Sequence, residues 1–180
     1  MKKQTPFLLI IRGTSGSGKS TIAHEVAMRE KAVLLGHDTF LFTMLPYKPE
    51  GKEHFTLGNK HLMDCFTNAL DAKKNIVMEG VFASFDLRIN RFQIAPFVRK
   101  ARALHYEVIR IQLQAPYKDA RDRMEKRGTI VPKVLYDKLK AALEKTSSQD
   151  EIIIDTHAIS PDTILEKVYG LINSCGGVKK

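Results

Sequence analysis

One short segment constrains the fold of this chain more than any other. Residues 13–20 read Gly-Thr-Ser-Gly-Ser-Gly-Lys-Ser and match the pattern G-x-x-x-x-G-K-[ST] at every fixed position. An apolar run precedes the segment and a helical pattern of apolar residues follows it. Its glycines let consecutive backbone N–H groups point at one anion, and the following helix adds its N-terminal dipole. The segment therefore predicts a phosphate-binding loop between a strand and a helix.

A loop of this kind predicts a nucleoside triphosphate with Mg²⁺ as its ligand, and we expect ATP. Lys19 is expected to reach the β- and γ-phosphates, and the Ser20 hydroxyl to ligate Mg²⁺. The expected nucleotide-binding residues are Gly13, Thr14, Ser15, Gly16, Ser17, Gly18, Lys19, Ser20 and Thr21.

Apolar runs alternate with amphipathic helical stretches along the chain, which is typical of a parallel sheet wrapped by helices. The candidate strands are residues 7–11, 32–35, 76–78, 108–113 and 152–154. Consecutive apolar positions are expected in strands that are covered on both faces. We predict one α/β domain over residues 1–180 with the P-loop NTPase fold, a doubly wound five-stranded parallel sheet in the order 2-3-1-4-5.

Composition narrows the setting. A hydrophobic share of 43% in 180 residues is enough for one core, and the absence of an 18-residue apolar run predicts no membrane span. Cys65 and Cys175 lack metal-ligand spacing, which indicates a reduced, cytoplasmic protein. The net charge of +9 favours polyanionic partners such as nucleic acid, although much of the excess can be ordinary solvated surface. Composition gives no oligomeric state.

A phosphate loop indicates a nucleotide but not a reaction. Residues 59–62 begin like the Asn-Lys-x-Asp guanine reader of GTPases, but they lack the aspartate and lie too early in the chain. ATPase motors place Asp-Glu after four apolar residues, whereas residues 76–80 read Ile-Val-Met-Glu-Gly with a lone acid. A compact nucleotide-dependent kinase is the class that remains.

Three further segments accompany the loop in order and spacing. Residues 34–40 place Asp38 just after the second strand, Ala115-Pro116 precedes a segment with three arginines, and residues 152–156 are followed by Ser160-Pro161. With these segments, the chain from about residue 7 to residue 172 resembles the small P-loop kinases of the phage polynucleotide kinase, zeta toxin and chloramphenicol phosphotransferase type. The resemblance implies ATP-dependent transfer to an alcohol group and a short arginine-bearing lid over about residues 116–132.

Asp38 is the candidate base. Ligands of open parallel sheets bind beyond the carboxyl ends of the strands, and Asp38 falls at such an end. The resemblance implies that its carboxylate accepts the proton of the attacking hydroxyl. The alternative is an aspartate that caps a helix starting at Thr39. His37 is interpreted as an ordinary loop residue.

Arg123 and Arg127 are four residues apart, so we expect them on one helix face, where like charges repel unless an anion binds between them. The resemblance implies that they clamp the triphosphate and stabilise the transferring phosphoryl group. Surface ion pairs, such as Asp119 with Arg123, are the alternative. Arg121 is interpreted as structural or as a contact on the adenine side.

For Glu79 and for the pair Arg88 and Arg91, the sequence allows either a functional or a structural role. Glu79 ends the third predicted strand, where it could hold Mg²⁺ through a water or hold the acceptor, or form a buried salt bridge to Lys19 or a nearby arginine. Arg88 and Arg91 could bind a phosphate of the substrate or belong to a solvated helical face.

The acceptor is also open from the sequence. A 5′-hydroxyl of nucleic acid and a small molecule, such as a nucleotide sugar, an antibiotic or a sugar acid, both fit the residues. A different class is a regulatory protein that binds ATP without catalysis.

Overall fold

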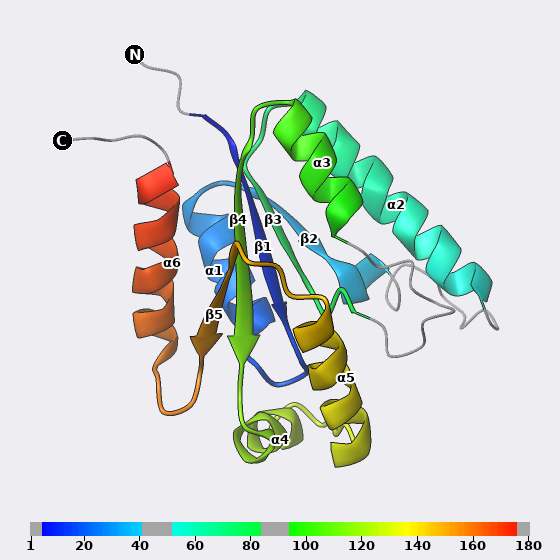
Figure 1. Cartoon of the computed structure of the whole chain (residues 1–180), viewed down its shortest axis with the longest axis vertical. Coiled ribbons are helices and arrows are strands. Elements are labelled where there is room, and N and C mark those ends of the chain that lie inside the picture. Colours follow the sequence, from blue (N-terminus) through cyan, green and yellow to red (C-terminus); the bar gives the residue numbers. More distant parts are fainter. Residues whose placement is uncertain (1–4, 41–51, 84–93, 176–180) are drawn as a thin grey trace.

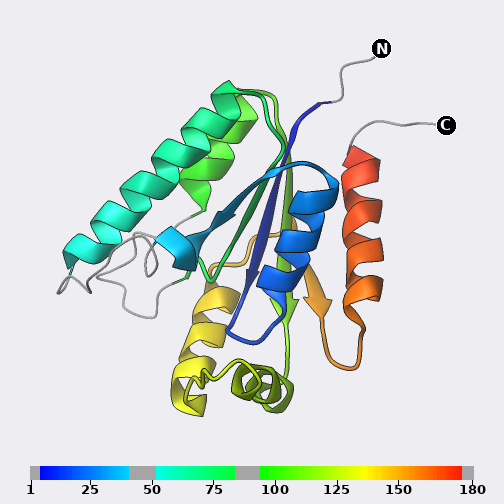
Figure 2. The same cartoon turned by 180° about the vertical axis from the view of Figure 1, so that it is seen from behind.

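A computed structural model of the protein describes residues 5–40, 52–83 and 94–175, which form a parallel sheet with helices on both faces (Figure 1; Figure 2 from behind). The strands are β1 (Phe7–Gly13), β2 (Val33–Gly36), β3 (Ile76–Gly80), β4 (Glu107–Gln114) and β5 (Glu151–Asp155). The helices are α1 (Lys19–Arg29), α2 (Lys52–Asp71), α3 (Ala95–Ala103), α4 (Tyr117–Glu125), α5 (Lys133–Lys145) and α6 (Pro161–Cys175).

The sheet confirms the predicted topology. Its strand order is β2-β3-β1-β4-β5 and all pairings are parallel. Each strand overlaps a predicted apolar run, with ends that differ by at most two residues. Among the helices of the described segments, none is both long and apolar enough to cross a bilayer.

Alternation along β1 separates two halves of the core. Leu8 and Ile10 face α2 and α3, which cover one side of the sheet. Leu9 and Ile11 face α1 and α6, which cover the other side. Every residue of β1 is buried, because β1 is the central strand and has helices on both sides.

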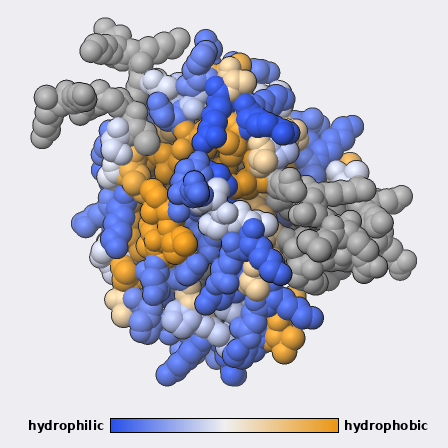
Figure 3. All heavy atoms as spheres, in the orientation of Figure 1, coloured by the Kyte–Doolittle hydropathy of each residue, from blue (hydrophilic) through white to orange (hydrophobic). Residues whose placement is uncertain are grey.

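β5 departs from the expectation that every strand is covered on both faces. Ile154 is buried against the α1–α6 layer, but Ile152 and Ile153 are 39% and 55% exposed. β5 is an edge strand that pairs only with β4. The helices cover an edge strand less completely than a central one, and these two side chains therefore stay open to solvent. Figure 3 shows apolar surface in the region where β5 lies in Figure 1.

The parallel pairing brings the carboxyl ends of the strands to one edge of the sheet. Gly13 ends β1 and Gly80 ends β3, while Asp38 follows β2 by two residues. β4 ends at Gln114, and its chain continues into α4 at the same edge (Figure 1). Segments far apart in the sequence therefore meet there.

The α2–α3 half of the core depends on Phe66, which is fully buried and packs edge-on against Phe97 with ring centroids 5.0 Å apart. We expect Phe66→Ala to lower the free energy of unfolding by about 3–5 kcal/mol, because the substitution leaves a cavity. Chemical denaturation measures the loss. Met28→Ala is the control, since Met28 is 68% exposed and its substitution should change stability by about 0.5 kcal/mol or less. Equal losses in the two variants would contradict this account of the core.

Candidate nucleotide and phosphoryl-transfer site

The phosphate loop, Gly13–Ser20, turns sharply between β1 and α1. Gly16 has φ +77° and Gly18 has φ +92°, in the left-handed region that favours glycine. A Cβ atom on Gly16 would lie 2.3 Å from the carbonyl oxygen of Ala120 in α4, so a side chain there would push the loop away from α4. A Cβ on Gly18 would meet no atom within 4 Å, which leaves open space beside the N-terminus of α1.

The residues of the loop fit a bound anion. Ser17 Oγ is buried and has no hydrogen-bond partner among the described residues, as expected of a donor that awaits a ligand. Lys19 opens α1 and is only 7% exposed, so its charge lies inside the loop. Buried positive charge and free backbone donors at a helix N-terminus are the features that bind phosphate.

Ser20 and Glu79 meet beside the loop. The Ser20 hydroxyl donates to Glu79 Oε2 at 3.2 Å, and Glu79 is 8% exposed within β3. Burial raises the pKa of Glu79, while the charge of Lys19 opposes the rise. Within the described residues no three His, Cys, Asp or Glu side chains cluster as a metal site. Mg²⁺ bound with phosphates usually keeps several waters and takes only one or two protein oxygens, and the Ser20 hydroxyl and the Glu79 carboxylate are oxygens of this kind.

Asp38 lies near this pair, at the carboxyl end of β2. Its side chain is 53% exposed, and its charge contributes to the raised pKa of Glu79. The position is compatible with a base that meets a substrate from solvent. Glu79 and Asp38 thus differ in environment, since one is buried against the loop and the other faces outward.

His37 is not the ordinary loop residue that the sequence predicts. It is 5% exposed, and its ring packs against Phe82 with centroids 5.0 Å apart. Its Nδ1 lies 3.8 Å from Asp38 Oδ1. Burial lowers the pKa of His37 to about 4, despite the opposing charge of Asp38. No periodic pattern surrounds His37 in the sequence, so its burial is a tertiary effect.

Arg123 has partners other than the Asp119 pair weighed from the sequence. Its Nη1 donates to the Gly16 carbonyl and to Thr156 Oγ1, each at 3.1 Å, and its Nη2 donates to the Thr156 carbonyl at 3.0 Å. Arg123 therefore joins α4, the phosphate loop and the end of β5. Thr156, which is 1% exposed, is a site residue that sequence reasoning missed.

Arg127 does not share a helix face with Arg123, contrary to prediction. α4 ends at Glu125, and Arg127 lies in the turn beyond it, which closes at Gly128 with φ +70°. Both arginines nevertheless line one cavity of about 270 Å³ beside the loop. The apolar residues that line this cavity are Ile22, Ile159, Pro161 and Ile164.

Two ion pairs involve other charged residues of α4. Arg121 Nε donates to Glu125 Oε1 at 2.7 Å on the exposed side, which agrees with a structural role. Asp119 Oδ2 lies 2.7 Å from Nδ1 of His157, in the turn after β5. The hydrogen bond to Asp119 raises the pKa of His157. This pair and Arg123–Thr156 are two separate ties between α4 and the same turn.

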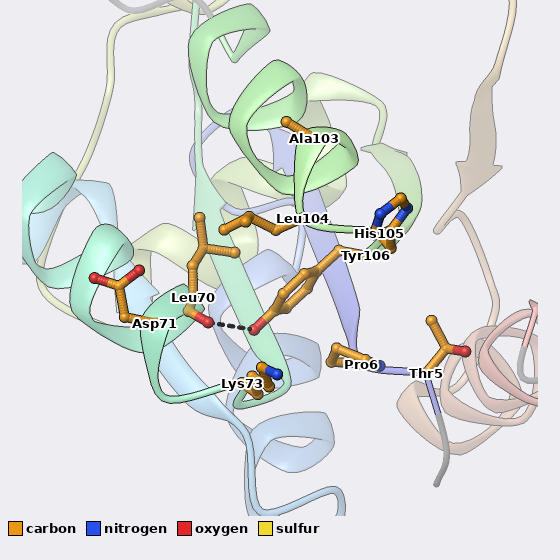
Figure 4. A pocket seen from close by; sticks show the side chains of 9 residues that line it. All are labelled: Thr5, Pro6, Leu70, Asp71, Lys73, Ala103, Leu104, His105 and Tyr106. Carbon is orange, nitrogen blue, oxygen red and sulfur yellow. Dashed lines mark hydrogen bonds between the residues drawn. The ribbon is translucent and has the colours of Figure 1, made fainter.

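A second cavity, of about 610 Å³, lies at the opposite edge of the sheet, where β1 and β4 begin (Figure 4). Leu70, Leu104 and Tyr106 form its apolar wall, and the Tyr106 hydroxyl donates to the Leu70 carbonyl at 3.3 Å. Because the strands separate it from the phosphate loop, it is not part of the candidate site. Arg88 and Arg91, the predicted substrate contacts, lie outside the described residues.

The parallel sheet and its loop define the chain as a protein with the P-loop NTPase fold. The family model AAA_33, described as an AAA domain, matches residues 8–146. Because this match covers well over half of the chain, the protein belongs to that family. A comparison with the sequences of curated proteins gives no match.

Solved structures with the same fold include several kinases. A sugar kinase from Janibacter aligns with TM-score 0.65 and 22% identity over 93% of this chain and 95% of that one. A gluconokinase from Sinorhizobium meliloti gives 0.61 and 15% over 97% and 95%. The APS kinase of Mycobacterium tuberculosis, in complex with AMPPNP and APS, gives 0.57 and 18% over 95% and 99%. At these identities the likeness shows a P-loop kinase-like fold, and the narrower resemblance to polynucleotide kinase and zeta toxin stays a prediction.

The buried His37 makes stability depend on pH. Its pKa is about 4 in the folded protein and about 6.5 when unfolded, so the unfolded chain binds more protons between these values. Stability should fall as pH drops from about 6.5 to 4, by up to about 3 kcal/mol from this group. We expect His37→Gln to flatten the fall in denaturation curves, and the exposed His24→Gln to leave it unchanged. An unaltered slope in His37→Gln would contradict the assignment.

The His157–Asp119 pair changes stability with pH in the opposite direction from His37. Because the folded pKa of His157 is raised, the stabilisation from the pair is present below the unfolded pKa and is lost as pH rises through the folded pKa. NMR titration should show a lower pKa of His157 in Asp119→Asn than in the wild type. Asp122→Asn, on the same helix, is the matched control. If both variants shift His157 equally, the direct pair is not the cause.

Proposed function

We propose that the protein is an ATP-dependent kinase that transfers the γ-phosphoryl group of ATP to a hydroxyl of its acceptor. The observation that carries the proposal is the meeting of Lys19, the Ser20–Glu79 pair and Asp38 at one edge of the sheet. A nucleotide-binding module has no need of an exposed carboxylate beside its terminal phosphate. Kinases among the structures of the same fold support this reading.

Each group has a role that follows from its place. The phosphate loop would hold the triphosphate through its backbone N–H groups and Lys19. Ser20, with Glu79 through a water, would hold Mg²⁺, which when bound neutralises phosphate charge. The cavity lined by Arg123, Arg127 and several apolar residues would receive the nucleotide, with its nucleobase against the apolar side chains and the arginines toward its phosphates. Asp38 would orient the acceptor hydroxyl and accept its proton.

The lid arginines divide these tasks. The guanidinium of Arg123 is engaged by Gly16 and Thr156, so it holds α4 on the loop. Arg127, in the exposed turn after α4, is then the better placed of the two to reach the transferring phosphoryl group. An arginine there would stabilise charge that develops in the transition state.

A small hydroxyl compound is the acceptor that the comparisons favour, because two structures of the same fold are named for sugar kinase and gluconokinase. The net charge of +9 favours a second candidate, a nucleic-acid 5′-hydroxyl. A labelled γ-phosphate screen over sugars, sugar acids, nucleotide sugars, antibiotics and oligonucleotides separates the two. A polymer acceptor should also bind much more weakly as salt rises.

Two substitutions test the assignment of roles. Lys19→Ala should lower turnover by about 10²–10³-fold and weaken binding of AMPPNP with Mg²⁺, because the positive charge that would face the phosphates is removed.

Asp38→Asn should lower kcat by about 10²–10⁴-fold and leave nucleotide affinity near that of the wild type. Calorimetry gives the affinity, and acceptor-dependent ATP consumption gives the rate.

Arg121→Ala serves as the control, since Arg121 pairs only along the exposed side of α4 with Glu125 among the contacts that the structure shows. Full activity of Asp38→Asn would overturn the assignment of the base. Nucleotide binding without ATP consumption in the presence of any acceptor of the screen would favour a regulatory nucleotide-binding protein instead.

A further inference from the structure

Arg12 carries a charge in a place where charges are costly. It directly precedes the first glycine of the phosphate loop, and it is 0% exposed. Its neighbours Ile10 and Ile11 are ordinary core residues. A buried guanidinium persists only where other groups compensate its lost hydration.

The compensating groups come from one distant stretch of the chain. Arg12 Nη1 donates to both carboxylate oxygens of Glu151 at 3.1 Å, and to the Thr146 carbonyl at 3.2 Å. Its Nη2 donates to Thr146 Oγ1. Thr146 caps the C-terminus of α5 and Glu151 begins β5, so the cation also faces the negative end of a helix.

These partners mark the place where the chain returns to the sheet after α4 and α5. The chain leaves β4 at Gln114, forms α4 and α5, and re-enters the sheet at Glu151 (Figure 1). Arg12 is the last residue before the phosphate loop, and its contacts therefore connect the loop with the far end of the α4–α5 unit. At the near end, Arg123 joins α4 to Gly16 of the same loop.

Stability alone is a poor reason to keep such a pair. Replacing a buried ion pair by apolar residues of similar volume is often neutral or stabilising, because desolvation offsets the attraction of the charges. Apolar residues cannot hold their neighbours in one fixed orientation, as directional hydrogen bonds can. The two contacts with Thr146 fix the end of α5 relative to the loop, and the two with Glu151 fix the start of β5, whereas apolar packing would allow both to shift.

We propose that Arg12 is a positioning residue that couples the phosphate loop to the α4–α5 unit through Glu151 and Thr146. The proposal rests on the proposed function, in which the loop binds the nucleotide. Binding at the loop then orders α4 and α5 because their C-terminal anchor is held at the root of the loop.

The neighbouring acid supplies a matched control. Asp150 accepts from Arg110 at 2.8 Å and from Arg102 at 3.0 Å, but its side chain is 49% exposed. Arg110 lies in β4 and has no contact with the phosphate loop among those the structure shows. Arg110→Met therefore removes the arginine that pairs with Asp150, next to Glu151, and leaves the contacts of Arg12 in place.

Hydrogen exchange with and without AMPPNP and Mg²⁺ tests the coupling on the full chain. In the wild type, nucleotide should slow exchange both in the loop and in residues 117–145. In the double variant Arg12→Met/Glu151→Leu, which avoids an unpaired buried charge, protection of the loop should stay within about twofold of the wild type. Protection of residues 117–145 should be lost.

Two milder variants keep the test sharp should the double variant unfold. Thr146→Val removes the hydroxyl that Arg12 contacts and should reduce the protection of α5, whereas Thr146→Ser should retain it. Arg110→Met should behave like the wild type. Thermal unfolding of each variant separates a loss of coupling from a loss of stability.

The outcomes separate this proposal from the one on which it rests. If calorimetry shows no nucleotide binding to the wild type, the proposed function falls and the coupling falls with it. If nucleotide binds but α4 and α5 are protected equally in the wild type, the double variant and Thr146→Val, only the coupling is overturned.

Discussion

The parallel pairing of β1 with β3 on one side and β4 on the other is the constraint on which the site depends. Because all three strands run in the same direction, their carboxyl ends lie at one edge, and the chain must turn there. The phosphate loop turns back over α1, while the chain after β4 turns into α4. Helices on both faces of the sheet bury β1 completely, and the close packing around this strand gives the loop a rigid base.

Charge is distributed around that edge according to burial. Lys19 and Glu79 lie within the protein, where the low local dielectric strengthens their mutual effect, and burial raises the pKa of Glu79. Asp38 stays half exposed, so an acceptor can reach its carboxylate from solvent. The separation of one buried acid beside the loop from one exposed acid near it gives the two carboxyl groups different chemical uses.

The α4–α5 unit is held to this edge at several points rather than by a broad apolar interface. Arg123 bonds Gly16 and Thr156, His157 bonds Asp119, and Tyr136 of α5 donates to the Ala115 carbonyl at 2.7 Å. Its own apolar cluster is small and consists of Ala115, Ala120, Met124 and Tyr136 with Tyr117 and Val131 beside them. Directional contacts over a small core are typical of an element that orients side chains near a ligand.

Local sequence patterns were enough to predict the phosphate loop and the strands. The octapeptide at residues 13–20 predicted the loop, and runs of apolar residues predicted the strands, because each pattern depends on neighbours within one turn or one strand. The sheet order also agreed with the prediction. Long-range packing determined the rest, namely the burial of His37, the contacts of Arg12 and Arg123, and the end of α4 before Arg127. These depend on residues up to 139 positions apart, and sequence periodicity carries no record of which distant group will face a buried charge.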